Sequence, residues 1–265
     1  MPGRTHLRIA AIGDIHCSKT SQGAFHALFS QISNSADVFV LCGDFTDYGL
    51  ADEARILARE LTSSMKIPSV AVLGNHDYEG GQAEQIAAIL TEAGVTILDG
   101  GATEIHGVGF AGAKGFGGGF GRGALGPWGE KAVKAFVQEA VDEAMKLEAA
   151  LARLRTTHRV AVLHYSPVRA TVEGEPPEIF PYLGSSRLEE PINRYRVNAV
   201  FHGHAHRGAA EGRTTAGVPV YNVAMPLLAR LNPSRPPFLI WELPLSGGEQ
   251  TPAPPVVDEP IVRSA

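Results

Sequence analysis

The stretch that decides the fold of this chain is Gly74-Asn75-His76-Asp77, which follows the apolar run Ser69–Leu73. A short apolar run that ends in a glycine turn predicts a buried strand. In open α/β folds, the side chains that follow such a strand lie at the carboxyl edge of the sheet, where ligands bind. Asn75 offers an amide oxygen to a hard metal ion, and His76 can hold or give a proton near neutral pH. Asp77 can accept from an imidazole or cap the next segment, and an ordinary polar turn is the alternative for all four residues.

Two earlier apolar runs end in the same way: Leu7–Ile12 precedes Gly13-Asp14-Ile15-His16, and Asp37–Cys42 precedes Gly43-Asp44-Phe45-Thr46-Asp47. Side chains two apart on an extended chain point the same way, so Asp14 and His16 can reach one metal together. Helical spacing of apolar residues over Gln22–Ser33 and Ala51–Ser64 separates the strands. The order predicts a βαβαβ half with parallel strands, which brings all three strand ends to one edge.

The rest of the chain continues the alternation of strands and helices. We expect helices over Gln82–Ala93, Glu130–Arg155 and Ser185–Arg194, and strands over Val95–Leu98, Thr103–Gly112, Arg159–Leu163, Val197–Phe201, Val218–Val223 and Phe238–Glu242. The last two look like closing strands of the second half. Two of these strands run into histidines, in His164-Tyr165-Ser166-Pro167 and in His202-Gly203-His204-Ala205-His206.

Length, composition and charge describe an ordinary globular protein. The chain has 265 residues, of which 44% are hydrophobic and 19% charged, and we expect one domain over 1–245 with a Pro/Gly-rich C-terminal tail over 246–265. A net charge of -5 argues against sequence-independent nucleic-acid binding, although a small anionic substrate is compatible with it. Two cysteines imply no disulfide framework. Neither a signal peptide nor an apolar run of membrane-spanning length is evident. Together these features favour a cytoplasmic protein. The oligomeric state is left open.

Ten glycines lie between Gly107 and Gly126. The segment lacks the strand-then-helix setting of a phosphate-cradling loop, so it is not a nucleotide-binding fingerprint. One interpretation is a mobile surface loop. The other is a loop over residues 111–127 near the metal edge that selects the substrate, with Lys114 and Arg122 holding an anionic group while Phe116, Phe120 and Trp128 surround its organic part.

Seven side chains collected from strand ends form the candidate site. Their oxygen and imidazole donors are too many for one metal of ordinary coordination and suit two cations that share a carboxylate: Asp14, His16, Asp44, Asn75, His164, His204 and His206. The order of these motifs, from Asp-x-His through Gly-Asp and Gly-Asn-His-Asp to Gly-His-x-His, resembles the calcineurin-like metallophosphoesterases over about Leu7–Val223.

This resemblance implies a fold, a ligand set and a reaction. The fold would be α/β, a four-layer α/β/β/α sandwich of two mixed β-sheets flanked by helices. Asp14, His16 and His206 would bind one metal, Asn75, His164 and His204 the other, and Asp44 would bridge them. His76 would assist departure of the leaving group and Asp47 would orient it. A water or hydroxide that bridges the metals would then attack phosphorus in line.

Departures from the family pattern narrow the substrate. Tyr48 stands where protein Ser/Thr phosphatases carry an arginine, and Asp47 stands where purple acid phosphatases carry an iron-binding tyrosine. The Gly-His-Ala-His ending is similar to bacterial phosphodiesterases, so we expect a phosphodiester of a small anionic molecule as substrate. A phosphomonoesterase with the same site and a non-catalytic metal-stabilised scaffold are the alternatives. The donors suit manganese, iron, zinc and cobalt alike.

Several polar residues near these motifs have two interpretations. His202 alternates with His204 and is either near the site or an ordinary strand-end histidine. Cys17 and Cys42 adjoin predicted ligands, and we interpret them as small core residues, with sensitivity to oxidation as the alternative. Tyr165 and Ser166 are candidates for the pocket wall.

Overall fold

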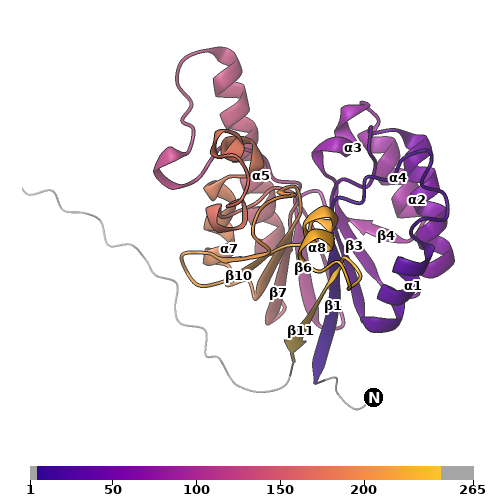
Figure 1. Cartoon of the computed structure of the whole chain (residues 1–265). Coiled ribbons are helices and arrows are strands. Elements are labelled where there is room, and N and C mark those ends of the chain that lie inside the picture. The colour runs from indigo at the N-terminus through magenta and orange to yellow at the C-terminus, as the bar shows by residue number, and fades with distance from the viewer. Residues whose placement is uncertain (1–4, 246–265) are drawn as a thin grey trace, which may run out of the picture.

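In the computed structural model, which describes residues 5–245, two β-sheets pack face to face and helices cover both outer faces (Figure 1). The predicted tail over 246–265 lies outside the described residues. The strands are β1 (His6–Ile12), β2 (Val38–Cys42), β3 (Ser69–Val72), β4 (Val95–Ile97), β5 (Gly101–Ile105), β6 (Val108–Gly112), β7 (His158–Val162), β8 (Ala199–His202), β9 (Glu211–Arg213), β10 (Pro219–Asn222) and β11 (Leu239–Pro244).

The longer helices follow the predicted periodicity, and several short ones fill the turns. The α-helices are α1 (His26–Ser35), α2 (Ala51–Ser64), α3 (Asn75–Glu79), α4 (Ala83–Glu92), α5 (Lys131–Arg153), α6 (Phe180–Leu183), α7 (Glu189–Arg194) and α8 (Met225–Leu231). The 3₁₀ turns are η1 (Gly121–Gly123), η2 (Arg169–Thr171), η3 (Pro177–Ile179) and η4 (Ser186–Leu188). No helix within residues 5–245 is long and apolar enough to cross a membrane.

The first sheet has the order β11-β1-β2-β3-β4, and its strands β1 to β4 are parallel, as predicted. The prediction that Phe238–Glu242 closes the second half is wrong. Strand β11 pairs antiparallel with β1, in a register that places Leu7 opposite Leu243. An alternating pattern gives no information about which sheet a strand joins, and here β11 occupies the edge of β1 that faces away from β2.

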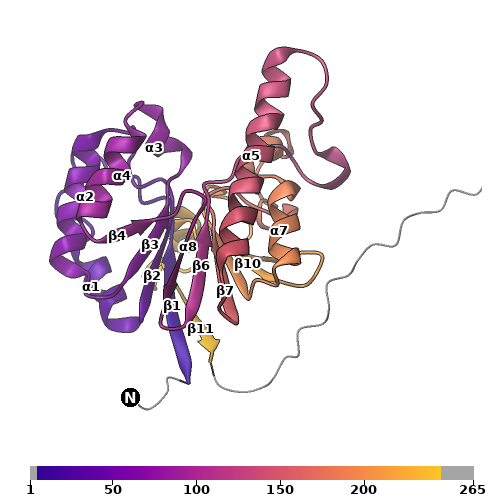
Figure 2. The ribbon, with the colours of Figure 1, turned by 180° about the vertical axis from the view of Figure 1, so that it is seen from behind.

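The second sheet has the order β5-β6-β7-β8-β10-β9, with parallel pairs from β6 to β10 and antiparallel pairs at both ends. Helices α5 and α7 cover its outer face, and Figure 2 shows the first half of α5 standing clear of the sheet. Both sheets are therefore mixed, and the four-layer α/β/β/α sandwich is confirmed.

The strands are apolar on both sides because each sheet is buried on both faces. Residues between the sheets, such as Leu7, Val40, Phe110 and Phe201, have no exposed surface. Burial of each such side chain contributes about 1.5–3 kcal/mol. The outer face of the first sheet packs on α1, α2 and α4, and that of the second on α5 and α7. This core fixes the two sheets relative to each other, and with them the strand ends at their shared carboxyl edge.

Candidate metal centre

All seven predicted ligands lie at the carboxyl ends of β1, β2, β3, β7 and β8. The two halves are joined at this edge by backbone hydrogen bonds, including Gly13 N–H to the Val223 carbonyl and Met225 N–H to the Gly13 carbonyl, each at 2.9 Å. Parallel order within each sheet, together with the packing of the two sheets, therefore brings together residues that are up to 192 positions apart in sequence.

Asp14, His16 and His206 form one group whose candidate ligand atoms lie within 4.8 Å of one another. His206 Nε2 is 2.9 Å from Asp14 Oδ1. Both ring nitrogens of His16 are buried and make no hydrogen bond within the described chain. A buried imidazole without a hydrogen-bond partner is costly, and a cation would satisfy one of its nitrogens.

Asp44, His164 and His204 form a second group, whose candidate ligand atoms also lie within 4.8 Å of one another. Asn75 joins it, because its Oδ1 lies 2.8 Å from His164 Nε2. Asp44 Oδ2 is 3.5 Å from His164 Nε2 and 3.8 Å from His16 Nε2, so this one carboxylate faces both groups. That is the position that a bridging ligand requires.

The backbone at the site is held in an uncommon conformation. Six non-glycine residues of the described chain have positive φ, and four of them are candidate ligands: Asp14 at 57°, His16 at 47°, Asp44 at 51° and His204 at 70°. Residues in this region are strained and persist only where the surrounding structure holds them, which is typical of functional sites. Here this backbone conformation directs side chains from several strand ends toward one point.

The electrostatics of the site favour cations. Burial, together with the nearby carboxylates of Asp14 and Asp77, raises the pKa of Asp44 to about 9. Positive charge between the two groups would offset this repulsion and the loss of hydration. Buried carboxylates, several imidazoles and the His16 nitrogens that make no hydrogen bond therefore fit a pair of divalent ions.

Backbone carbonyls orient two of the imidazoles. His164 Nδ1 donates to the Cys42 carbonyl at 2.8 Å, which leaves Nε2 facing Asn75 and Asp44. His204 Nε2 donates to the Tyr182 carbonyl at 3.1 Å, which leaves Nδ1 free for a metal. Such outer contacts fix the tautomer and the ring orientation of metal-binding histidines.

His76 lies beside the first group, with its ring centroid 4.6 Å from that of His16. Its Nδ1 donates to the backbone carbonyl of Asp47 at 2.7 Å. The carboxylate of Asp47 lies instead 3.4 Å from His16 Nδ1, and the carboxylate nearest to His76 Nδ1 is that of Glu79 at 3.5 Å. Asp47 therefore forms its hydrogen bond to His76 through its main chain, which sequence patterns do not reveal, while its carboxylate lies within 4.8 Å of a ring nitrogen of His76.

Asp77 organises the turns that carry the ligands, a role that its sequence position indicated only in part. Its carboxylate caps α3 by accepting from Gly74 N–H at 2.8 Å. It also accepts from the amides of Phe45 and Thr46 and from the Thr46 hydroxyl. One buried carboxylate thus joins the turn after β3 to the turn after β2.

His202, by contrast, is a satisfied core histidine. Its Nδ1 donates to the Gly203 carbonyl at 2.8 Å, and its Nε2 lies 2.8 Å from the Thr171 hydroxyl. Both nitrogens have partners, so the strand-end interpretation holds.

The glycine-rich segment packs against the site. Most of residues 111–119 are buried, so the surface-loop interpretation is wrong for this part. Gly118 and Gly119 donate their amides to the carbonyls of Pro181 and Gly184, on either side of the Tyr182 carbonyl that holds His204. A close approach of two backbones explains the glycines here, because a Cβ at Gly117 would lie 2.5 Å from the Pro181 carbonyl oxygen. Arg122, farther along, is exposed.

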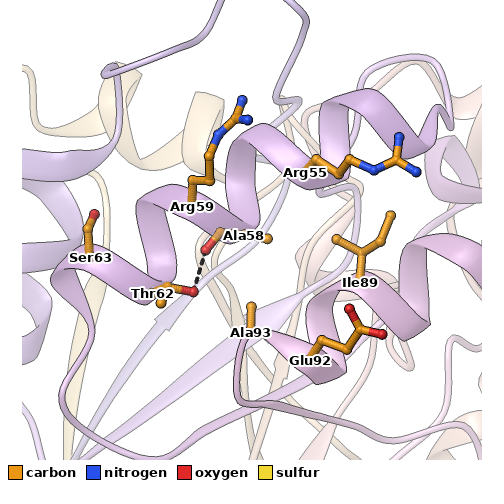
Figure 3. A pocket seen from close by; sticks show the side chains of 8 residues that line it. All are labelled: Arg55, Ala58, Arg59, Thr62, Ser63, Ile89, Glu92 and Ala93. Atoms are coloured by element: carbon orange, nitrogen blue, oxygen red, sulfur yellow. Dashed lines mark hydrogen bonds between the residues drawn. The ribbon is translucent and has the colours of Figure 1, made fainter.

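A groove of about 490 Å³ lies elsewhere, on the outer helical layer between α2 and α4 (Figure 3). It is lined by Arg55, Ala58, Arg59, Thr62, Ser63, Ile89, Glu92 and Ala93. None of these residues is a predicted ligand, and the groove contains no group of His, Cys, Asp and Glu side chains close enough to share a metal. The chemistry of the described chain is concentrated at the sheet edge.

The fold and the donor set define a metal-binding α/β/β/α sandwich. The family model of calcineurin-like phosphoesterases matches residues 7–208, and the chain belongs to this family. Members of the family are generally metal-dependent phosphoester hydrolases that bind two metal ions. No curated protein matches the chain.

Several solved structures share the fold. The chain is similar to phosphopantetheinyl hydrolase (PptH) from Mycobacterium tuberculosis, with a TM-score of 0.64 and 16% identity over 89% of this chain and 96% of that one. It is also similar to TT1561 of Thermus thermophilus, with a TM-score of 0.55 and 17% identity over 84% and 91%. GAP50, the anchor in the inner membrane complex of Plasmodium, is similar with a TM-score of 0.53 and 13% identity, over 84% of this chain and 73% of that one. At such identities the likeness shows the fold alone.

Proposed function

We propose that the protein hydrolyses a phosphoester, and more specifically a phosphodiester of a small anionic molecule, at a centre of two cations. Asp14, His16 and His206 would hold one cation, and Asn75, His164 and His204 the other. The observation that supports this most strongly is the position of Asp44, whose Oδ2 faces His16 of one group and His164 of the other. Two bound cations would supply an activated water and positive charge for the phosphoryl oxygens.

The residues around the cations would position the substrate and move a proton. Because Nδ1 of His76 donates to the Asp47 carbonyl, its Nε2 is the atom free to act. A protonated Nε2 at this position would donate to the leaving oxygen as the ester bond breaks. The Nδ1 contact would hold the ring in place through both protonation states, because Nδ1 carries a proton in each of them.

Hydrolysis of two chromogenic esters tests the proposal. Protein purified without added metal would be analysed for its elements, then assayed with bis-p-nitrophenyl phosphate and p-nitrophenyl phosphate, with and without manganese. We expect metal-dependent turnover that favours the diester. A preference for p-nitrophenyl phosphate would indicate a phosphomonoesterase, and bound metal with no turnover of either ester would indicate a scaffold. The assay with manganese, iron, zinc and cobalt in turn would identify the metal that supports turnover.

A further inference from the structure

Lys114 is a buried cation at the start of the glycine-rich segment. Only 9% of its surface is exposed. Its ammonium donates to the Gly115 carbonyl at 2.9 Å, and no carboxylate of the described chain forms an ion pair with it. The nearby carboxylate of Glu143 is already engaged by the Gly115 amide and by Lys146 Nζ, each at 2.8 Å.

Aromatic rings, rather than an anion, surround this ammonium. Nζ lies 4.9 Å from the ring centroid of Phe116, 5.4 Å from that of Tyr165 and 5.6 Å from that of Tyr78. Ring faces attract a cation, but they do not replace its hydration or supply a counter-charge. Burial accordingly lowers the pKa of Lys114. The cage leaves N–H donors of the ammonium without a strong acceptor.

The cage lies beside the candidate metal centre and between the two halves of the molecule. The ring of Tyr165 is centred 4.5 Å from that of His204 and 5.4 Å from that of His164. Tyr78 comes from the opposite half, two residues after His76 on α3. The ammonium is thus separated from the second ligand group by one aromatic ring. Lys114 would therefore lie near an ester phosphoryl group that the ligands hold, without contacting it directly.

We propose that Lys114 binds a second anionic group, carried by the organic part of the substrate, so that the preferred substrates are phosphoesters with an additional carboxylate or phosphate. This inference rests on the proposed function for the position of the scissile ester. Tyr78 and Tyr182, which are 43% and 61% exposed at the same edge, offer apolar surface for the part of the substrate between the two anionic groups.

A matched pair of diesters tests this inference: phenyl p-nitrophenyl phosphate and 4-carboxyphenyl p-nitrophenyl phosphate, which differ by one carboxylate. A hydrogen bond to a charged group is worth roughly 10- to 100-fold, so kcat/KM of the wild type should favour the carboxylated ester by about that factor. The variant Lys114→Met, which keeps the length of the side chain, should lose this preference, and Lys114→Arg should keep part of it. Lys146→Met, which removes an exposed lysine that contacts the same Glu143, is the matched control and should retain the preference.

Binding measured without turnover separates the inference from the proposed function. The metal-loaded protein would be titrated calorimetrically with (4-carboxyphenyl)phosphonate and with phenylphosphonate. We expect tighter binding of the carboxylated compound by the wild type and Lys146→Met, and equal binding of both compounds by Lys114→Met. If the phenyl ester is cleaved but neither assay depends on Lys114, the inference is wrong and the proposed function stands. If neither ester is cleaved while the calorimetric preference depends on Lys114, the proposed function is wrong and the anion site stands.

Discussion

The two halves of the molecule contribute different chemistry to the shared edge. The first half provides buried carboxylates, Asp14, Asp44 and Asp77, in short turns directly after its strands. The second half provides imidazoles, His164, His204 and His206, and no carboxylate among the candidate ligands. It also carries the long connections between β6 and α5 and between β7 and α7.

This difference suggests a division of roles. Buried carboxylates in short, hydrogen-bonded turns favour bound cations, whatever the substrate. Long connections around the histidines of the second half can vary in sequence without changing these carboxylates, and they place Lys114 and Tyr182 next to the ligands. Reaction chemistry would then depend mainly on the first half, and selection of the substrate on the second.

The largest effect should follow from Asp44→Asn, because Asp44 faces both ligand groups. Loss of an outer contact to a metal ligand costs about 10–100-fold, so loss of a shared ligand should lower kcat by more than that and reduce the content of both metals. Asp14→Ala should instead deplete one site more than the other. Elemental analysis with kinetics checks both variants. Two tightly bound metals and a near-normal rate in Asp44→Asn would refute the bridging assignment.

His76→Ala should leave the metal content intact and lower the rate by about 10²–10⁴-fold, the contribution typical of a general acid. The loss should shrink for esters of p-nitrophenol, whose leaving group departs without a proton, and grow for alkyl esters. Asp47→Asn is the matched comparison, because it keeps the backbone carbonyl that holds His76 Nδ1. Its effect should be smaller than that of His76→Ala. An equal loss on p-nitrophenyl and alkyl esters would argue against proton donation by His76.

The sequence predicted the first half of the fold in detail and the second half in outline. Strands β1 to β3 and helices α1, α2 and α4 follow from apolar runs and helical spacing, and α2 begins and ends where periodicity places it. The prediction of one strand over Thr103–Gly112 is wrong, because β5 and β6 form an antiparallel pair with a turn between them. Strand β9, helices α3 and α8 and the pairing of β11 were not predicted. Short edge strands carry little apolar pattern, and strand pairing depends on tertiary context.

The candidate ligands were predictable because each follows a strand end, and parallel order brings such ends together. The supporting contacts were not. The carbonyls of Asp47 and Tyr182, which hold His76 and His204, are main-chain atoms that every residue type possesses. Lys114 was noticed as a charge in a glycine-rich segment, but its aromatic cage joins residues from three separate stretches of sequence.

A pair of glycine substitutions tests whether the two metal sites can be weakened separately. The expected loss of metal affinity is intermediate in size. A Cβ at Gly74 would lie 2.1 Å from Asp44 Oδ1, and one at Gly203 would lie 2.2 Å from Asp14 Oδ2. Gly74→Ala should therefore weaken both metals, and Gly203→Ala mainly the metal bound by Asp14, each by about 10–100-fold in affinity. Gly123→Ala, which meets nothing within 4 Å, is the control. Equal loss of both metals in the two variants would mean that the sites are not separable in this way.

The smallest effect concerns stability and the charge of Lys114. Burial lowers its pKa in the folded protein below the value of 10.5 for an unfolded chain. Between these two pKa values the unfolded state binds more protons, so the stability of the wild type rises with pH in that range. At pH values below that range, Lys114 is charged in both the folded and the unfolded state, and the folded state bears the full cost of burying the charge.

Lys114→Met should therefore raise Tm at neutral pH, by the order of 2–4 °C that 1 kcal/mol produces in a chain of about this size. The difference in Tm between Lys114→Met and the wild type should become smaller as the pH approaches 10.5. Lys146→Met removes a lysine that is paired with Glu143 and Asp99 and should give no such gain. A Met variant that is less stable than the wild type at every pH would show that the cage itself stabilises the cation, and Lys114 would then need no anion from a substrate.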